Sequence, residues 1–105
     1  MLASGDAVVV YGGGTASCPP QPGVTFQIAT GASLSLNNGG DTVTVADGGG
    51  IVLATYTWGA GEADNNQSIV LDPELDSAGP YIEHSAAPGS IGNFSPGTRA
   101  DGTPL

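Results

Sequence analysis

The amino-acid sequence predicts an all-β domain, a sandwich of short antiparallel strands, and three observations support this fold class. Short runs rich in Val, Ile, Thr and aromatic residues recur along the 105 residues. Clusters of Gly, Asn, Asp and Pro, the residues that dominate turns, separate these runs. No long window has the apolar spacing of an amphipathic helix. The length suits one domain, residues 1–105, and is too short for two.

The first half of the chain contains three candidate strands. Ala7–Tyr11 is a continuous apolar run, which predicts a strand buried on both faces. After a loop rich in Gly and Pro, residues 24–30 alternate apolar and polar side chains, so one face of a strand would meet the core. Leu34 and Leu36 repeat that spacing and predict a further short strand.

A β-hairpin is the strongest local prediction. Residues 41–46 alternate threonine with valine, and the Asp-Gly-Gly-Gly turn at 47–50 leads into a second strand at 51–58. The Asn-Asn-Gly-Gly run at 37–40 precedes the pair, and Asn and Gly accept the positive φ that tight turns demand.

The rest of the chain predicts little regular structure and a thin core. Short strands are expected at 67–71 and 81–84, and residues 88–105 are expected to form an extended C-terminal coil. Tyr56 and Trp58 are two residues apart and therefore share one strand face. Because aromatic residues are few, we expect this pair to pack in the core; a ligand-binding platform is the alternative.

The charge balance restricts the classes of partner. Ten acidic residues oppose a single basic residue, Arg99, so the net charge is −9. Such a surface repels phosphate backbones and anionic lipids, and we expect no nucleic-acid partner. No stretch is apolar for long enough to predict a membrane span. An acidic chain without lysine suits a salty or secreted environment, although selection for solubility explains it equally well.

Candidate catalytic motifs are incomplete. His84 and Ser90 could belong to a Ser/His/Asp set, but Pro88 occupies the position of the first glycine of a nucleophile elbow. The glycine run at 12–14 lacks the later glycine and the following helix of a dinucleotide-binding motif. We therefore predict that the protein is not an enzyme, has no catalytic residues and holds no cofactor.

Metal binding has only weak candidates. Glu62, Asp64 and Asn65 bring oxygen ligands into one loop, which suits a hard cation such as calcium. Their spacing does not match an EF-hand, and charges in loops are usually solvated, so the prediction is no metal, with these three residues as weak calcium candidates. Cys18 is the only cysteine, which excludes a disulfide within the chain and a cysteine metal site.

Taken in order, several segments resemble a bacterial lamin tail domain, over nearly the whole chain. The most specific is Leu-Asn-Asn-Gly-Gly-Asp-Thr-Val-Thr at 36–44. The matching segments are residues 2–14, 34–45, 55–59, 67–73 and 94–104. The resemblance implies an immunoglobulin-like β-sandwich with no shared active site. It also implies an accessory module of secreted or surface proteins, which in bacteria is often fused to nucleases, phosphatases or other hydrolases.

The chain differs from lamin tail domains in its first strands, and this difference leads to a further expectation. Lamin tail domains usually begin with additional strands, including an acidic Phe-Ile-Glu-Leu-like strand, before the segment that here follows Met1. The resemblance therefore implies a domain that lacks its N-terminal strands and has an open sheet edge, and open edges template pairing.

The expected function is a non-catalytic structural or protein-interaction module, extracellular or at the cell surface. Its partner would be another protein, or a second copy in a homodimer, bound through a sheet edge. The alternative is a carbohydrate- or calcium-dependent binding module accessory to a secreted hydrolase.

Overall fold

The computed structural model describes residues 3–16, 18, 20–62 and 65–105. Within these residues the regular structure is almost entirely strand, with one short 3₁₀ turn, which confirms the all-β prediction. The elements are β1 (Ala7–Tyr11), β2 (Val24–Ile28), β3 (Gly40–Ala46), β4 (Val52–Gly59), β5 (Ile69–Leu71), β6 (Tyr81–Glu83) and η1 (His84–Ala86).

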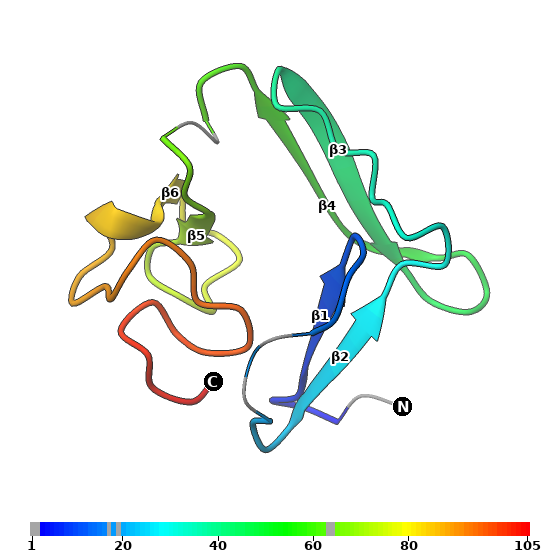
Figure 1. Ribbon diagram of the computed structural model, residues 1–105, viewed down its shortest axis with the longest axis horizontal. Helices are drawn as coiled ribbons and strands as arrows, with labels where there is room; N and C mark the ends of the chain where they lie inside the picture. The colour runs from blue at the N-terminus through cyan, green and yellow to red at the C-terminus, as the bar shows by residue number, and fades with distance from the viewer. Residues whose placement is uncertain (1–2, 17, 19, 63–64) are drawn as a thin grey trace.

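The strands of the described residues form three separate two-stranded sheets. β1 pairs with β2 in parallel, whereas β3 with β4 and β5 with β6 are antiparallel pairs. The three sheets are arranged around the middle of the molecule (Figure 1). Because an isolated two-stranded sheet is marginally stable in water, each pair depends on what packs against its faces.

The predicted hairpin is confirmed. β3 and β4 pair from Gly40 and Gly59 at one end to the turn at the other. The turn is closed by Asp47, whose Oδ1 accepts hydrogen bonds from the N–H groups of Gly49 and Ile51, both at 2.9 Å. An aspartate side chain in this position mimics a backbone acceptor of the turn. This explains why the Asp-Gly-Gly-Gly sequence correctly predicted the turn.

The two faces of the β3–β4 hairpin differ in chemistry. One face carries cross-strand threonine pairs, with Thr42 and Thr57 hydroxyl oxygens 2.7 Å apart. The other face carries Val43 opposite Tyr56, and Asp41 opposite Trp58. The ring of Tyr56 lies 3.9 Å from that of Tyr81 on β6, measured between centroids, so this apolar face is turned toward the β5–β6 sheet.

The β1–β2 sheet corrects one prediction. β1 was expected to be buried on both faces, but Val8 and Val10 are 43% and 47% exposed, while the alternate residues are half-buried. On the other face of this sheet Phe26 lies near Tyr11 across the strands, with ring centroids 6.2 Å apart, and the C-terminal segment near Gly97 covers Phe26. Isolated parallel pairs with an exposed face are unusual, because parallel sheets are normally covered on both sides.

The strand expected at Leu34 and Leu36 does not form. Ser35 between them has a φ of 52°, which belongs to the left-handed region and interrupts an extended strand. Its N–H donates a hydrogen bond of 3.0 Å to the hydroxyl of Ser33. Local hydrogen bonding by serine thus outweighs the alternation of leucines.

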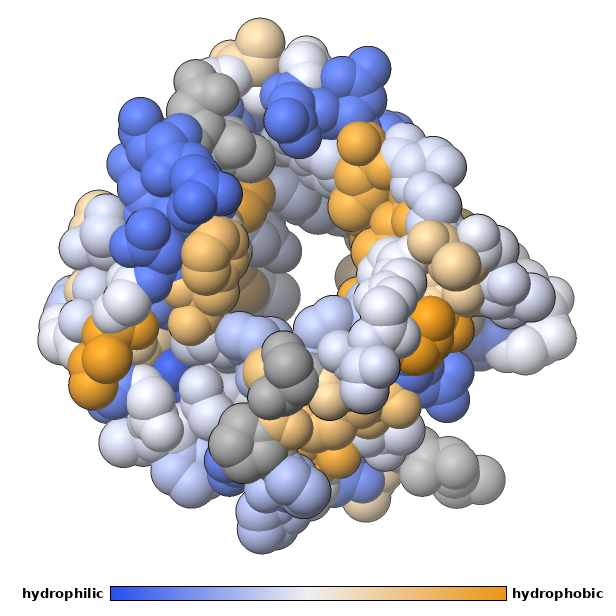
Figure 2. Space-filling view, viewed as in Figure 1, coloured by the Kyte–Doolittle hydropathy of each residue, from blue (hydrophilic) through white to orange (hydrophobic). Residues whose placement is uncertain are grey.

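The molecule has an open middle and a small core. Among the described residues only Ala87 and Ala100 are buried apolar side chains, and His84 is the only buried polar one. Hydrophobic side chains stand on the walls of a central opening (Figure 2). The accessible surface is 6942 Å², whereas a compact monomer of this mass exposes roughly 5,300 Å². The radius of gyration, 13.9 Å, likewise exceeds the about 12.9 Å of a compact chain of this length.

Candidate binding groove

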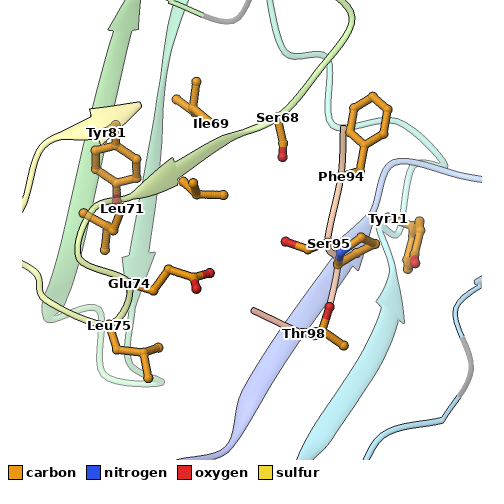
Figure 3. Close-up of a pocket in the computed structure, with 12 residues that line it drawn as sticks. Tyr11, Ser68, Ile69, Leu71, Glu74, Leu75, Tyr81, Phe94, Ser95 and Thr98 are labelled. Atoms are coloured by element: carbon orange, nitrogen blue, oxygen red, sulfur yellow. The ribbon is translucent and has the colours of Figure 1, made fainter. Parts of the chain in front are cut away.

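An apolar groove of about 590 Å³ lies between the β5–β6 sheet and the end of β1 (Figure 3). We call it the β5 groove. The strand β5 and the β5–β6 loop form one wall, and the segment 94–98 forms the other. Its lining residues are Tyr11, Ser68, Ile69, Val70, Leu71, Glu74, Leu75, Tyr81, Phe94, Ser95, Pro96 and Thr98.

The β5 wall has a strand edge whose backbone groups are open. β6 occupies one edge of β5. On that edge His84 N–H donates to the Ser68 carbonyl at 2.9 Å, and Asp72 N–H donates to the Pro80 carbonyl at 2.9 Å. In an antiparallel ladder alternate residues bond to the same neighbour, so Ile69 and Leu71 direct their N–H and C=O groups to the other edge. No strand of the described residues pairs with that edge.

The opposite wall is held by turns. Ser68 N–H donates to the Asn93 carbonyl at 3.0 Å, which ties the start of this wall to the residue that precedes β5. Farther along, Gly97 lies against Val24 and Phe26 of β2. Between these two attachments Phe94 is 54% exposed and lines the groove, so a large aromatic surface faces solvent.

Half of the polar side chains that line the groove are engaged in hydrogen bonds within the chain. Glu74 is the charged lining residue, and its Oε1 accepts a 2.7 Å hydrogen bond from the N–H of Ala100. The hydroxyl of Ser68 donates to the Asn93 carbonyl at 3.3 Å. A ligand would therefore meet mainly apolar side chains and the open backbone edge of β5.

A smaller groove of about 300 Å³ continues from the first, because Ser68 and Ile69 line both. Its other lining residues are Tyr56, Trp58 and Gln67. The rings of Tyr56 and Trp58 are stacked, with centroids 6.5 Å apart and an interplanar angle of 20°. The two aromatics share a face as predicted, but they are half-buried and line an open groove, where a core position was expected.

Both aromatic side chains are fixed at their polar ends. The indole N–H of Trp58 donates to the Asn37 carbonyl at 3.0 Å. The hydroxyl of Tyr56 donates to Oε2 of Glu62 at 2.9 Å. Removal from solvent, followed by this hydrogen bond and the charge of Glu62, raises the pKa of Tyr56 to about 12.

We predict that an ultraviolet absorbance titration will show one of the three tyrosines ionising near pH 12. Since the pKa is raised on folding from 10.0, the contribution of Tyr56 to stability is present below about pH 10 and is lost as the pH rises toward about 12. Glu62→Gln should lower this pKa, because it removes the carboxylate that disfavours the phenolate. Glu83→Gln is the matched control, since Glu83 bonds to Asn65 instead. An equal response to both variants would contradict the assignment.

The described calcium candidates, Glu62 and Asn65, are hydrogen-bonded to other groups of the chain. Both carboxylate oxygens of Glu62 accept hydrogen bonds, from Tyr56 and from the N–H of Gly59. The side-chain amide of Asn65 donates to Glu83 at 2.7 Å. Asp64 lies outside the described residues. Among the described residues no group of His, Cys, Asp and Glu is arranged to hold a metal ion, and the absence of a metal stays a prediction.

The candidate catalytic residues are not joined in the described part of the chain. His84 Nδ1 lies 3.2 Å from the Gly92 carbonyl oxygen. The hydroxyl of Ser90 donates to the Ser85 carbonyl at 3.3 Å, away from the histidine ring.

A side-chain hydrogen bond joins Cys18 to Tyr11. The Tyr11 hydroxyl and the Cys18 Sγ are 2.8 Å apart, and this hydrogen bond raises the pKa of Tyr11. The pairing brings together the end of β1 and the loop that follows it.

Sequence reasoning missed most of the β5 groove. Phe94 and Pro96 lie in a segment expected to be coil, and nothing local in the sequence shows that it faces β5. The exposed Phe94 in a glycine- and proline-rich segment was the one available signal.

Comparisons with protein-family models, with curated proteins and with solved structures found no significant match to this chain. The resemblance to lamin tail domains therefore stays a prediction from the residues. In the part of the chain that the structure describes, no helix has the length and apolar character needed to cross a bilayer.

Proposed function

We propose that this chain is a non-catalytic binding module that associates with another polypeptide through open sheet edges. In this proposal it is an immunoglobulin-like sandwich of the lamin tail type, acting outside the cell or at its surface, and an added strand closes the sandwich. The open backbone edge of β5 beside the apolar β5 groove is the observation that carries the proposal.

The large accessible surface area of the chain supports the presence of an interface for a partner. The chain exposes 6942 Å², which is about 1,600 Å² more than a compact monomer of its mass. A standard protein–protein interface buries about 800 Å² on each partner. The excess is therefore sufficient for one such interface, and hydrophobic side chains are exposed around the central opening (Figure 2).

The marginal stability of two-stranded sheets also supports association through a sheet edge. Two-stranded sheets need a third strand or a packed layer for independent stability. An added strand on β5 would satisfy the backbone groups of Ile69 and Leu71 and cover the apolar lining at the same time. The acidic, lysine-free surface suits an extracellular or salty environment.

Self-association of the purified chain tests this proposal. Two copies repel each other at a net charge of −9 each, so dimerisation through sheet edges should strengthen as salt shortens the Debye length from about 30 Å to about 3 Å. We expect sedimentation velocity to show a mass that rises with protein and NaCl concentration. A monomer under all these conditions would contradict association between copies.

Two leucine substitutions localise the contact. Leu71→Lys places a charge in the β5 groove and should abolish the association, since inward-pointing charges protect sheet edges. Leu53→Lys makes the same chemical change at a side chain that is 67% exposed on β4, and it should leave association unchanged. Equal loss in both variants would assign the effect to net charge and not to β5.

A further inference from the structure

We propose that the β5 groove receives an extended, basic β-strand from a different protein, with apolar residues at alternate positions. This inference rests on the proposed function and specifies the chemistry of the partner. The backbone edge, the apolar lining and the charge of the chain each restrict one property of the occupant.

The backbone edge requires an extended occupant. Ile69 and Leu71 direct their N–H and C=O groups away from β6, and both residues line the β5 groove. A partner that satisfies these groups must present its own N–H and C=O groups at the strand repeat of about 3.3 Å per residue. The short β5 thus pairs with about three or four residues of the partner, as in peptide recognition by strand addition.

The lining requires apolar side chains at every second position. A strand paired with β5 would point alternate side chains into the space between β5 and the Phe94 wall. This space is about 590 Å³ and is lined mainly by aliphatic and aromatic residues. Apolar side chains placed there would cover this lining, whereas an occupant that is polar throughout would leave it without apolar contacts.

The charge of the chain favours a basic partner over a second copy. Asp72, Glu74 and Asp76 follow β5 directly, and Glu83 ends β6. The single basic residue, Arg99, donates through Nε to the Pro104 carbonyl at 3.2 Å. A second copy would bring a further net charge of −9 to these acidic residues, whereas Lys or Arg at the remaining positions of a partner strand would be attracted.

A peptide of alternating Val and Lys, about eight residues long, is the probe for this inference. We expect fluorescence anisotropy to show binding of this peptide to the intact chain that weakens with added salt. A peptide of alternating Val and Glu should not bind. A peptide with the same Val and Lys composition arranged in two blocks should bind at least about tenfold more weakly, because it cannot present one apolar face. Equal binding of the block peptide would reduce the interaction to charge alone and overturn the inference.

Two matched variants place the peptide in the groove. Phe94→Ser removes an exposed aromatic side chain from the groove wall and should weaken binding by about tenfold or more. Ile91→Ser changes a side chain that is 67% exposed and does not line the groove, and it should bind normally. Unchanged binding in Phe94→Ser would overturn the placement.

Hydrogen exchange gives a measurement that does not depend on variants. The amides of Ile69 and Leu71 should become protected when the alternating Val and Lys peptide binds, since they would then donate to its carbonyls. Peptide binding without this protection would contradict strand pairing. If the chain self-associates through β5 but the peptide does not bind, the basic occupant is wrong and the proposed function stands. If neither occurs, both are wrong.

Discussion

Replacement of Gly97 by valine is expected to lower the free energy of unfolding by about 3 to 4 kcal/mol. Gly97 has a φ of 82°, where a side chain is strained. A Cβ at this position would also lie 3.1 Å from Val24 Cγ1 and 3.2 Å from Phe26 Cζ. Because these atoms belong to β2, the branched side chain would push the C-terminal segment away from the β1–β2 sheet.

Gly92→Val is the matched control for this effect. Gly92 has a φ of 74°, and nothing lies within 4 Å of the position of its Cβ. It therefore introduces the same backbone strain, about 1 to 2 kcal/mol, without the clash. Urea denaturation of both variants should separate the two contributions, with Gly97→Val lower by about 2 kcal/mol. Equal losses would show that the segment near Gly97 does not support the fold through β2.

The Gly97 contact also affects the groove. The segment 94–98 forms the wall opposite β5, and its attachment to β2 lies at Gly97. A folded Gly97→Val chain should therefore hold Phe94 less firmly and bind the alternating Val and Lys peptide more weakly than Gly92→Val does.

The hairpin β3–β4 was predictable because its determinants are local. The Asp47 side chain closes the turn with groups two and four residues away, and threonine and valine alternate over a length that exceeds most strands of the chain. The strands β5 and β6 were predicted with longer bounds, since turn residues on either side mark them but do not show where pairing stops.

The long-range features could not be predicted from patterns. The parallel pairing of β1 with β2 depends on where two runs meet in space, and neither run contains that information. Residues 88–105 were expected to be extended coil, but they fold back through tight turns, such as Thr98 N–H to the Ser95 carbonyl and Gly102 N–H to the Arg99 carbonyl. This segment forms one wall of the groove. The candidate site therefore could not be predicted from the alternation of apolar and polar residues along the chain.

His84→Ala is expected to lower the free energy of unfolding by about 2 to 4 kcal/mol, the second large effect. The side chain of His84 is fully buried, in a molecule that buries few others among its described residues. A carbonyl oxygen only accepts, so His84 Nδ1 must donate the 3.2 Å hydrogen bond to Gly92. This bond joins η1 to the segment that leads into the Phe94 wall, and alanine removes both the bond and the packed ring.

A second substitution separates packing from hydrogen bonding at this site. Nε2 of His84 is buried and has no partner among the described residues, and a buried polar atom without a hydrogen bond is destabilising by about 1 to 3 kcal/mol. His84→Phe fills similar space, loses the bond to Gly92 and removes the unpartnered nitrogen, so it should cost less than His84→Ala. Ser85→Ala, an exposed neighbour, should change stability by less than about 0.5 kcal/mol. If His84→Phe were as damaging as His84→Ala, the Nδ1 bond to Gly92, rather than the packed ring, would hold η1 against the C-terminal segment.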